Sequence, residues 1–445
     1  MGKVNRYYKV MQLLLCVTPD KKLNGSCCVP GDKSISHRAA LIGSMAEGKT
    51  VIHNFSKGDD CRRTLQWLKA LGVEIQQENA KLCIQGRGLN GFCEPDNLLD
   101  AGNSGTTLRL LLGLLTGQDF FSVITGDPSL CRRPMGRVIE PLVKMGAEIR
   151  ARCDNTLPPI CIRGTNSLHP LEYTLPIPSA QVKSAILLAG MNAKGQTTVV
   201  QQLPSRDHTE RMLQYFGAPL TIKDNVICLQ GKRPIKGQEI RIPGDISSAA
   251  FIMVAAVLVP GSQVLIKDVG INPTRTGIID VLRMMGAEIE VLDQRSWNGE
   301  PVADLMIRSG QLKGTEIKNP LLPRVLDEIP VLAVAAAAAE GETVISDAAE
   351  LRVKETDRLK AIASELRKMK IEIKEKHDGL IIRGGQLRAA RVKSWGDHRM
   401  AMALAVAGLI ADGETVIEDA DCIDISFPDF PDVMKALGAG IRLEN

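Results

Sequence analysis

The stretch PGDKSISHR, residues 30–38, places a Pro-Gly turn, two hydroxyls and three basic side chains directly before the apolar segment AALIGSMA. The turn residues and the apolar segment behind them predict a helix that begins near Lys33. The N-terminus of a helix carries unpaired N–H groups and partial positive charge, which attract anions. Lys33, Ser34 and Arg38 are therefore candidates for binding a phosphate or a carboxylate.

Similar polar loops precede five other apolar segments, and a second set of polar loops lies between strands and amphipathic segments. The first set carries Asn103, Ser104, Gly105 and Thr106; Ser179 and Gln181; Asp245 and Ser247; Asp327 and Glu328; and Asp397, His398 and Arg399. The second set carries Asp59 and Arg62; Arg132, Arg133 and Arg137; Arg206, Asp207 and His208; Arg275; and Lys354, Glu355, Asp357 and Arg358. Arginine suits bidentate contact with carboxylates and phosphates, and lysine is a point charge that can also pass a proton.

Each of these loops has a simpler interpretation when it is taken alone. Ser34, Ser247, Asp32 and Asp327 are residue types that cap helices. The stretch KETDRL could be a solvated run of charges, and GNSGTT matches neither the P-loop nor the dinucleotide-binding fingerprint. The equivalent places of the loops in a repeat favour one shared anion site over many unrelated caps.

The repeat is visible in three signatures that occur six times at a period of about seventy residues. A polar loop opens an apolar segment, a Gly turn then leads into a strand such as EGKTVIHNF or EGETVISDA, and an amphipathic segment ends in a stop such as LGVEI or MGAEI. Gly directly after a helix is the expected left-handed stop, and the fifth copy has Lys370 in its place. The stretch IPGDISSAA, residues 242–250, is similar to VPGDKSISH, residues 29–37, which indicates that the chain consists of two halves of three units each.

The apolar segments are hydrophobic nearly all round, which predicts helices buried inside each half. If three units pack symmetrically in each half, the buried helices run parallel and their N-termini emerge on one face. Two halves that meet at this face would direct six N-termini toward one cleft, which would suit a polyanionic ligand.

Composition excludes several classes of protein. The 445 residues exceed one ordinary core, and 3% aromatic residues and a net charge of +4 argue against nucleic-acid or membrane-surface binding. The 11 cysteines show no metal-ligand spacing, which indicates free thiols in a reducing cytoplasm. No apolar run approaches the roughly 18 residues of a membrane span, so we expect a soluble, cytoplasmic protein.

Nine motifs in order resemble the 5-enolpyruvylshikimate-3-phosphate synthase family over essentially the whole chain after about residue 20. They are PGDKSISHR, GNSGTTLR, RRPMGR, SAQVKSA, RDHTE, PGDISSAAF, LDEIPVLAVAA, RVKETDRL and GDHRMAMA, and RPMGR with SAQVKSA is similar to the second bacterial class. The resemblance implies an α/β fold, a two-domain inside-out α/β barrel with six repeated units and pseudo-threefold symmetry in each domain. We expect residues 28–241 to form one domain, and residues 1–27 with 242–445 to form the other.

The resemblance also implies an activity: transfer of the enolpyruvyl group of phosphoenolpyruvate to the 5-hydroxyl of shikimate 3-phosphate, with release of phosphate, in aromatic amino-acid (chorismate) biosynthesis. It implies no cofactor, no metal, no nucleic acid and no membrane, and we expect a monomer. Positions that match the family's shikimate 3-phosphate site are Lys33, Ser34, Arg38, Ser179, Ala180, Gln181, Arg206, Asp327 and Lys354. Positions that match its phosphoenolpyruvate site are Lys33, Gly105, Arg133, Gln181, Arg358 and Arg399.

Lys33, Asp327 and Glu355 match catalytic positions. Protonation of the methylene carbon needs an acid, loss of the hydroxyl proton needs a base, and departing phosphate needs fixed cations. By resemblance, Glu355 is the acid/base and Asp327 the base toward the hydroxyl. We expect like charges on the two halves to hold the domains apart until shikimate 3-phosphate binds.

Two other hypotheses stay open at this point. One is the sister enolpyruvyl transferase that acts on UDP-N-acetylglucosamine and uses a cysteine of a mobile loop; Cys131 lies in a comparable loop, directly before RRP. The other is a phosphoanion- or RNA-binding repeat protein without catalysis. Two positions also depart from the family: Leu110 replaces a proline of the first class, and Ser426 stands where some members have lysine.

Overall fold

The computed structural model describes residues 13–19, 22–78 and 81–444, and it is built from one unit used six times. Each unit has an inner helix, an outer helix and a four-stranded sheet, so the repeat predicted from the sequence is confirmed. The inner helices are α1 (Lys33–Met45), α3 (Gly105–Thr116), α6 (Ala180–Gly190), α8 (Ile246–Leu258), α10 (Ile329–Ala338) and α12 (His398–Gly408). The outer helices are α2 (Asp59–Ala70), α4 (Gly136–Lys144), α7 (His208–Tyr215), α9 (Gly277–Met284), α11 (Arg358–Lys368) and α13 (Phe430–Ala436).

The six sheets share one strand order, with a parallel pair at one edge and antiparallel neighbours beyond it. In the first half they are β14 (Glu239–Arg241), β3 (Glu47–His53), β5 (Lys81–Arg87), β4 (Glu74–Glu78); β6 (Leu99–Asp100), β7 (Phe121–Thr125), β9 (Leu157–Arg163), β8 (Glu148–Ala151); and β10 (Glu172–Leu175), β11 (Gln196–Gln201), β13 (Val226–Gln230), β12 (Leu220–Lys223). In the second half they are β2 (Asn24–Cys28), β15 (Gln263–Gly270), β17 (Glu300–Arg308), β16 (Ile289–Trp297); β18 (Glu316–Ile317), β19 (Glu342–Ile345), β21 (Gly379–Arg383), β20 (Glu372–Lys376); and β22 (Arg391–Lys393), β23 (Thr415–Glu418), β1 (Leu14–Thr18), β24 (Gly440–Glu444).

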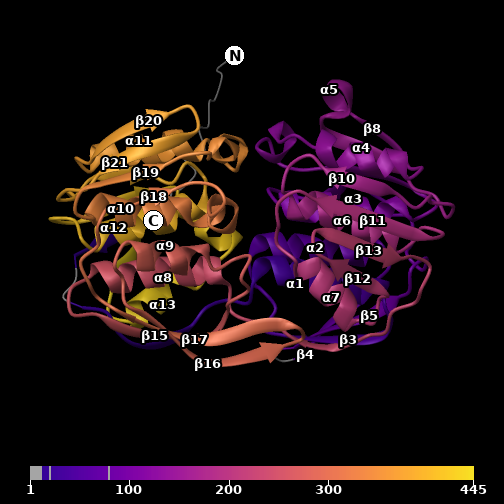
Figure 1. Ribbon diagram of the computed structural model, residues 1–445, viewed down its shortest axis with the longest axis horizontal. Coiled ribbons are helices and arrows are strands. Elements are labelled where there is room, and N and C mark those ends of the chain that lie inside the picture. The colour runs from indigo at the N-terminus through magenta and orange to yellow at the C-terminus, as the bar shows by residue number, and fades with distance from the viewer. Residues whose placement is uncertain (1–12, 20–21, 79–80, 445) are drawn as a thin grey trace, which may run out of the picture.

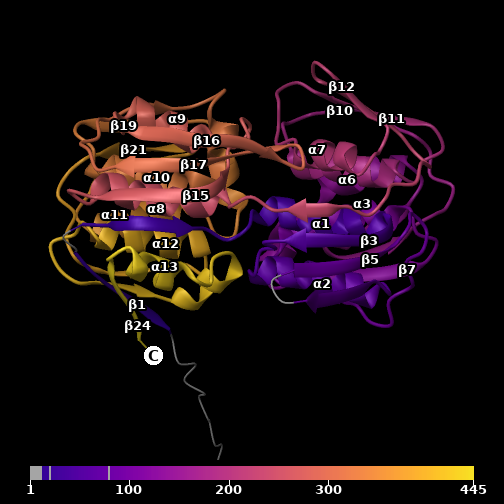
Figure 2. The same cartoon turned by 90° about the horizontal axis from the view of Figure 1, so that it is seen from below.

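Two separate hydrophobic cores hold these units together. One core consists of buried residues between Ile35 and Ile242. The other consists of Leu15, Val17, Leu23 and Val29 together with buried residues from Ile246 to Ile441. Figures 1 and 2 show the corresponding lobes side by side, with the sheets outside and the inner helices within. None of the helices in the described part of the chain is long and apolar enough to cross a membrane.

The chain passes between the lobes twice, and the two passages run next to each other. Gly31 pairs with Gly244 across them, and the N–H groups of Asp32 and Asp245 donate to the carbonyls of Pro243 and Pro30, each at 2.8 Å. We propose that the domains are divided here, as residues 28–241 and as residues 1–27 with 242–445. Residues 1–12 and 20–21 of the second domain lie outside the described residues.

The inner helices α3 and α6 pack closely because small residues lie where their backbones meet. A Cβ atom on Gly113 of α3 would lie 2.4 Å from the carbonyl oxygen of Ala185 in α6, far inside a normal contact. Glycine is therefore required at this crossing, and the two helices can approach until their backbones touch.

The outer helices end as the sequence predicts. Gly72, Gly146, Gly217, Gly286 and Gly438 follow five of them with positive φ, and Lys370 takes the same left-handed conformation, with φ of 67°, in the fifth unit. A residue with a side chain is strained in this region, whereas glycine is not.

Replacing Lys370 with glycine should therefore stabilise the protein. The left-handed strain of roughly 1–2 kcal/mol is relieved, and the greater freedom of glycine in the unfolded chain offsets part of this gain. We expect a net increase of about 0.5–1 kcal/mol in the free energy of unfolding, measured by urea denaturation. The control Lys360→Gly, at an exposed position inside α11, should destabilise by about 1 kcal/mol. A Lys370→Gly variant that is as unstable as this control would contradict the strain argument.

Candidate active site

A cleft of about 510 Å³ lies between the two lobes. Its walls include residues at or directly before the N-termini of all six inner helices, as the repeat predicts. These are Lys33 and Ser34, Gly105 and Thr106, Ser179 to Gln181, Asp245, Asp327, and Arg399. Further wall residues come from the second set of loops: Arg133, Arg206, Arg275, Lys354 and Glu355.

Five of the inner helices have a side-chain cap at this end. Asp32, Ser104, Ser179, Asp245 and Asp397 each accept a hydrogen bond from a backbone N–H group in the first turn. The capping interpretation is thus right for Asp32, whereas Ser34, Ser247 and Asp327 do not cap their helices. Ser247 instead donates to Glu328 and accepts from Arg275, both at 2.5 Å.

Lys33 and Arg38 both extend from α1, but their side chains lie in different surroundings. Lys33 pairs with Asp60 at 2.9 Å; burial alone would lower the pKa of Lys33, but Asp60 raises it. Arg38 is only 3% exposed and donates to Thr209, to Ser184 and to the carbonyl of Ser34. Burial lowers the pKa of Arg38 to about 10, so it remains a cation at neutral pH.

Asp327 is surrounded by arginines of both lobes. Arg206 contacts it at 2.5 Å, Arg275 at 3.5 Å, and Arg358 and Arg399 at 3.8 Å. Burial would raise the pKa of this carboxyl, but the arginines, Arg206 first, hold it well below its usual value. Asp327 is therefore a carboxylate that can accept a proton or a hydrogen bond.

Glu355 is also a carboxylate, because two arginines contact it. Its carboxylate contacts Arg358 at 2.7 Å and Arg133 of the other lobe at 3.4 Å. Burial would raise the pKa of Glu355, but Arg358 and Arg133 hold it well below its usual value. Arg358 is in turn fixed from behind, since its Nε donates to Asp397 at 2.7 Å.

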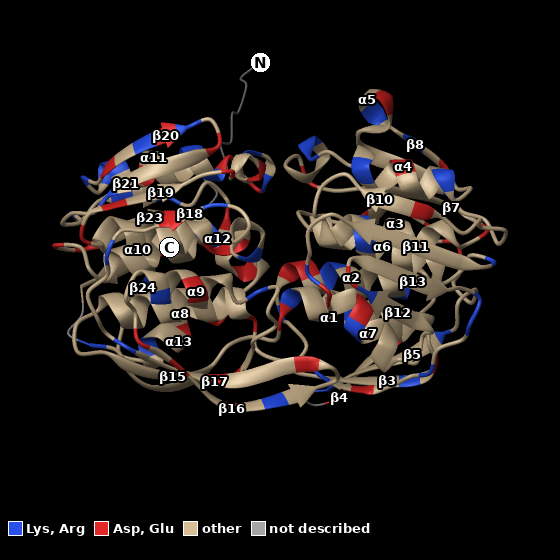
Figure 3. Cartoon of the chain, in the orientation of Figure 1, with Lys and Arg blue, Asp and Glu red and all other residues tan. Residues whose placement is uncertain are grey.

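The walls of the cleft carry both signs of charge, so the expectation of like charges facing each other is wrong. Arg206 with Asp327, and Arg133 with Glu355, are ion pairs between the two lobes, and Ser129 Oγ donates to the carbonyl of Glu355 at 3.0 Å. Figure 3 shows acidic and basic residues together where the lobes meet. Opposite charges thus attract the two walls toward each other.

The structure brings the predicted site residues together around the cleft, with Arg358 as the one exception. All of the positions predicted for the two substrates and for catalysis line the cleft, except Arg358, which is 1% exposed and lies behind Glu355. Lys354 also has a neighbour that the sequence analysis did not consider, because it pairs with Glu350 at 3.0 Å.

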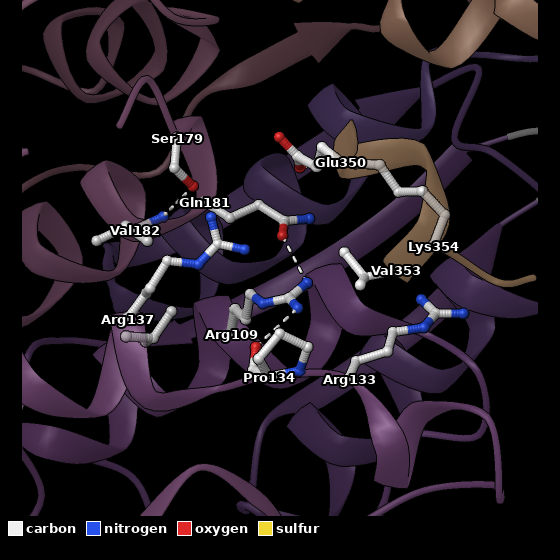
Figure 4. Close-up of a pocket in the computed structure, with 11 residues that line it drawn as sticks. Arg109, Arg133, Pro134, Arg137, Ser179, Gln181, Val182, Glu350, Val353 and Lys354 are labelled. Carbon is white, nitrogen blue, oxygen red and sulfur yellow. Dashed lines mark hydrogen bonds and ion pairs between the residues drawn. The ribbon is translucent and has the colours of Figure 1, made fainter. Parts of the chain in front are cut away.

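Several residues of the cleft were missed by sequence reasoning. Asp60, not its neighbour Asp59, faces Lys33, while Asp59 pairs with Arg62 on the surface. Arg109 lies one helical turn after Gly105 and donates to Gln181, as Figure 4 shows. The sequence could have indicated Arg109, because it lies four residues after Gly105 and therefore on the same side of the helix. No sequence pattern distinguishes Asp60 from Asp59; only the ion pair with Lys33 in the structure does.

The positions that depart from the family lie away from the cleft lining. Leu110 is completely buried in the first core, and Ser426 is 7% exposed next to the backbone of Gly58 in the other lobe. Cys131, the candidate for a cysteine-dependent transferase, is also absent from the cleft lining, and its thiol donates to the carbonyl of Gly126 at 3.3 Å.

Comparison with known proteins agrees with this geometry. The sequence model of EPSP synthase (3-phosphoshikimate 1-carboxyvinyltransferase) matches residues 17–434. The chain is 54% identical over 423 residues to a 3-phosphoshikimate 1-carboxyvinyltransferase of Desulforamulus reducens, covering 95% of this chain and 98% of that protein. It is 51% identical over 425 residues to the enzyme of the same name from Petrotoga mobilis, covering 95% and 98%.

A solved structure is similar over the whole chain as well. The EPSP synthase of Acinetobacter baumannii superposes with a TM-score of 0.87 at 43% sequence identity, covering 98% of this chain and all of that one. Three findings lead to the same assignment: the family model matches nearly the full length of the chain, the relatives are more than 50% identical to it, and the solved structure has the same fold. The chain belongs to the EPSP synthase (3-phosphoshikimate 1-carboxyvinyltransferase) family.

Proposed function

We propose that this protein transfers the enolpyruvyl group of phosphoenolpyruvate to the 5-hydroxyl of shikimate 3-phosphate and releases phosphate. The observation that carries the proposal is a pair of ionised carboxylates, Asp327 and Glu355, inside a cleft whose other charged groups are mostly cations. A protein that only bound anions would gain nothing from two carboxylates there. An addition-elimination reaction needs groups that accept and return protons next to fixed positive charge. We also propose that the enzyme acts as a cytoplasmic monomer.

The two anionic substrates would share the cleft along α1. Lys33 would contact both, while Ser34, Arg38, Ser179, Ala180, Arg206 and Lys354 would surround shikimate 3-phosphate. Arg133, Arg358 and Arg399 would hold phosphoenolpyruvate, with Gly105 beside it and Gln181 between the two substrates. The pairs Arg206 with Asp327 and Lys354 with Glu350 support this arrangement, because a phosphate can replace a carboxylate as the partner of each cation.

Protons would move through the two carboxylates. Addition joins the 5-oxygen to C2 of the enolpyruvyl group while C3 gains a proton and the hydroxyl loses one. Elimination removes a proton from C3 and breaks the bond between C2 and the phosphate oxygen. Asp327 would accept the hydroxyl proton, and Glu355 would deliver the proton to C3 and take one back.

Glu355 must gain a proton before it can act as an acid. Its pKa is held low by Arg358 and Arg133, the same cations that would bind phosphoenolpyruvate. Substrate anions that occupy these cations would weaken their hold on Glu355 and raise its pKa, so the group would become an acid only in the loaded site.

Neutral variants of the two carboxylates test the mechanism. Phosphate release should require both substrates, and Glu355→Gln and Asp327→Asn should each lower kcat by roughly 100-fold or more. Both replacements keep the shape of the side chain, so circular dichroism should stay close to the wild type, while the loss of a mostly buried ion-pair partner should lower the melting temperature. The matched controls are Glu140→Gln and Asp412→Asn, which neutralise exposed ion-paired carboxylates outside the cleft lining and should leave turnover unchanged. Near-normal turnover of either active-site variant would remove that residue from the mechanism.

The space beside Gly105 leads to a prediction about glyphosate, which resembles phosphoenolpyruvate in charge and length. We expect inhibition competitive with phosphoenolpyruvate, because no side chain at residue 105 crowds the anion. A Cβ atom there would lie 2.8 Å from Arg109 Nη1 and 3.4 Å from Arg133 Nη1, so the methyl group of Gly105→Ala must displace Arg109 and would touch Arg133.

The expected result is relief of inhibition by roughly ten- to a hundredfold, with some increase in KM for phosphoenolpyruvate. The control Gly136→Ala places a methyl group no closer than 3.6 Å to its neighbours. It should change neither the inhibition constant of glyphosate nor KM for phosphoenolpyruvate. Full activity of the wild type in millimolar glyphosate at low phosphoenolpyruvate would contradict this prediction.

A further inference from the structure

Arg109 connects three separate parts of the first lobe at one end of the cleft. It lies on α3, its Nη1 donates to Gln181 Oε1 on α6 at 2.7 Å, and its Nη2 donates to the carbonyl of Pro134 at 3.3 Å. Figure 4 shows the guanidinium between these two acceptors, with Arg133 and Arg137 on either side. The contacts join one turn of α3, the start of α6 and the loop before α4.

The contact with Gln181 determines which way its amide faces. A guanidinium has five donors and no acceptor, so only the amide oxygen can meet Arg109. The amide nitrogen must then point the other way, where Nε2 donates to Thr106 Oγ1 at 2.9 Å. Both Thr106 and Gln181 line the cleft, so Arg109 presents the donor end of Gln181, not its acceptor end, to that side.

The contact with Pro134 acts on the neighbouring residue. Arg133 is 7% exposed and donates to Asn103 Oδ1 at 2.6 Å, in addition to its contact with Glu355. By holding the next carbonyl, Arg109 fixes the backbone from which the Arg133 side chain extends. Two proposed ligands of phosphoenolpyruvate are thus positioned by one side chain.

Three guanidinium groups gather here, and this affects the charge of Arg109. Burial lowers its pKa to about 10, with Arg133 and Arg137 adding to the effect. It therefore stays protonated at neutral pH, and both of its terminal nitrogens are engaged by protein acceptors.

We infer that Arg109 is a positioning residue for phosphoenolpyruvate: it turns the donor end of Gln181 into the cleft and fixes the loop that carries Arg133. The inference rests on the proposed function and assigns Arg109 no contact with either substrate. Without Arg109, only the Thr106 hydroxyl holds the amide of Gln181, and a hydroxyl can pair with either end of an amide, so the amide can rotate and present an acceptor to an anion.

A double-mutant cycle tests the inference with phosphate release as the assay. Arg109→Met keeps the aliphatic packing and removes all donors, and it is combined with Gln181→Ala. We expect Arg109→Met to raise KM for phosphoenolpyruvate roughly tenfold, and KM for shikimate 3-phosphate less than threefold. In the double variant, the increase in KM for phosphoenolpyruvate should be at least fivefold smaller than the product of the two single increases. The reason is that Gln181→Ala then removes a side chain that Arg109→Met has already misplaced.

Two further variants separate positioning from folding and from net charge. Arg109→Lys keeps the charge and can reach one of the two acceptors, so its KM for phosphoenolpyruvate should lie between those of the wild type and Arg109→Met. Arg163→Met removes an exposed arginine of β9 in the same lobe and should leave both KM values unchanged.

The outcomes separate this inference from the proposed function. If the wild type releases no phosphate from the two substrates, the proposed function fails. If the wild type is active but the effects in the cycle multiply, or if Arg109→Met and Arg109→Lys leave KM for phosphoenolpyruvate unchanged, the positioning role is overturned. Equal increases in both KM values would also overturn it, since a general disturbance of the cleft would produce that result.

Discussion

Complete burial of the inner helices limits where this protein can place its polar groups. Helices such as α8 and α10 are apolar on every side, so their flanks accept no polar side chain without a partner. Their N-termini are the exception, because unpaired N–H groups there need acceptors and attract anions. With six such ends directed at one cleft, the fold supplies a site for anionic substrates before any basic side chain is added.

Charge balance is the second constraint on the site. Asp327 and Glu355 are kept ionised by arginines, and two of their ion pairs join the lobes directly. The proposed substrates would compete with these carboxylates for the same cations. Substrate binding and the proton affinity of Glu355 are therefore coupled, which gives the site a way to form an acid only when it is occupied.

A layer of residues behind the cleft determines how the proposed ligands point. Asp397 fixes Arg358, Asp60 pairs with Lys33, and Arg109 orients Gln181. These contacts are charge-assisted hydrogen bonds in partly buried surroundings, so their geometry is better defined than that of surface pairs. The precision of the site depends on them as much as on the groups that would touch substrate.

The sequence by itself determined the repeat, the inner and outer helices, and the loops that carry the site, because hydrophobic pattern and turn residues are local properties. It even placed Lys370 at a left-handed stop, which its φ of 67° confirms. Only the tertiary structure decided which neighbour faces inward, as with Asp60 and not Asp59, and that opposite charges meet across the cleft. Such pairs join residues up to 222 positions apart, and contacts over that distance depend on how the lobes pack, which no local pattern records.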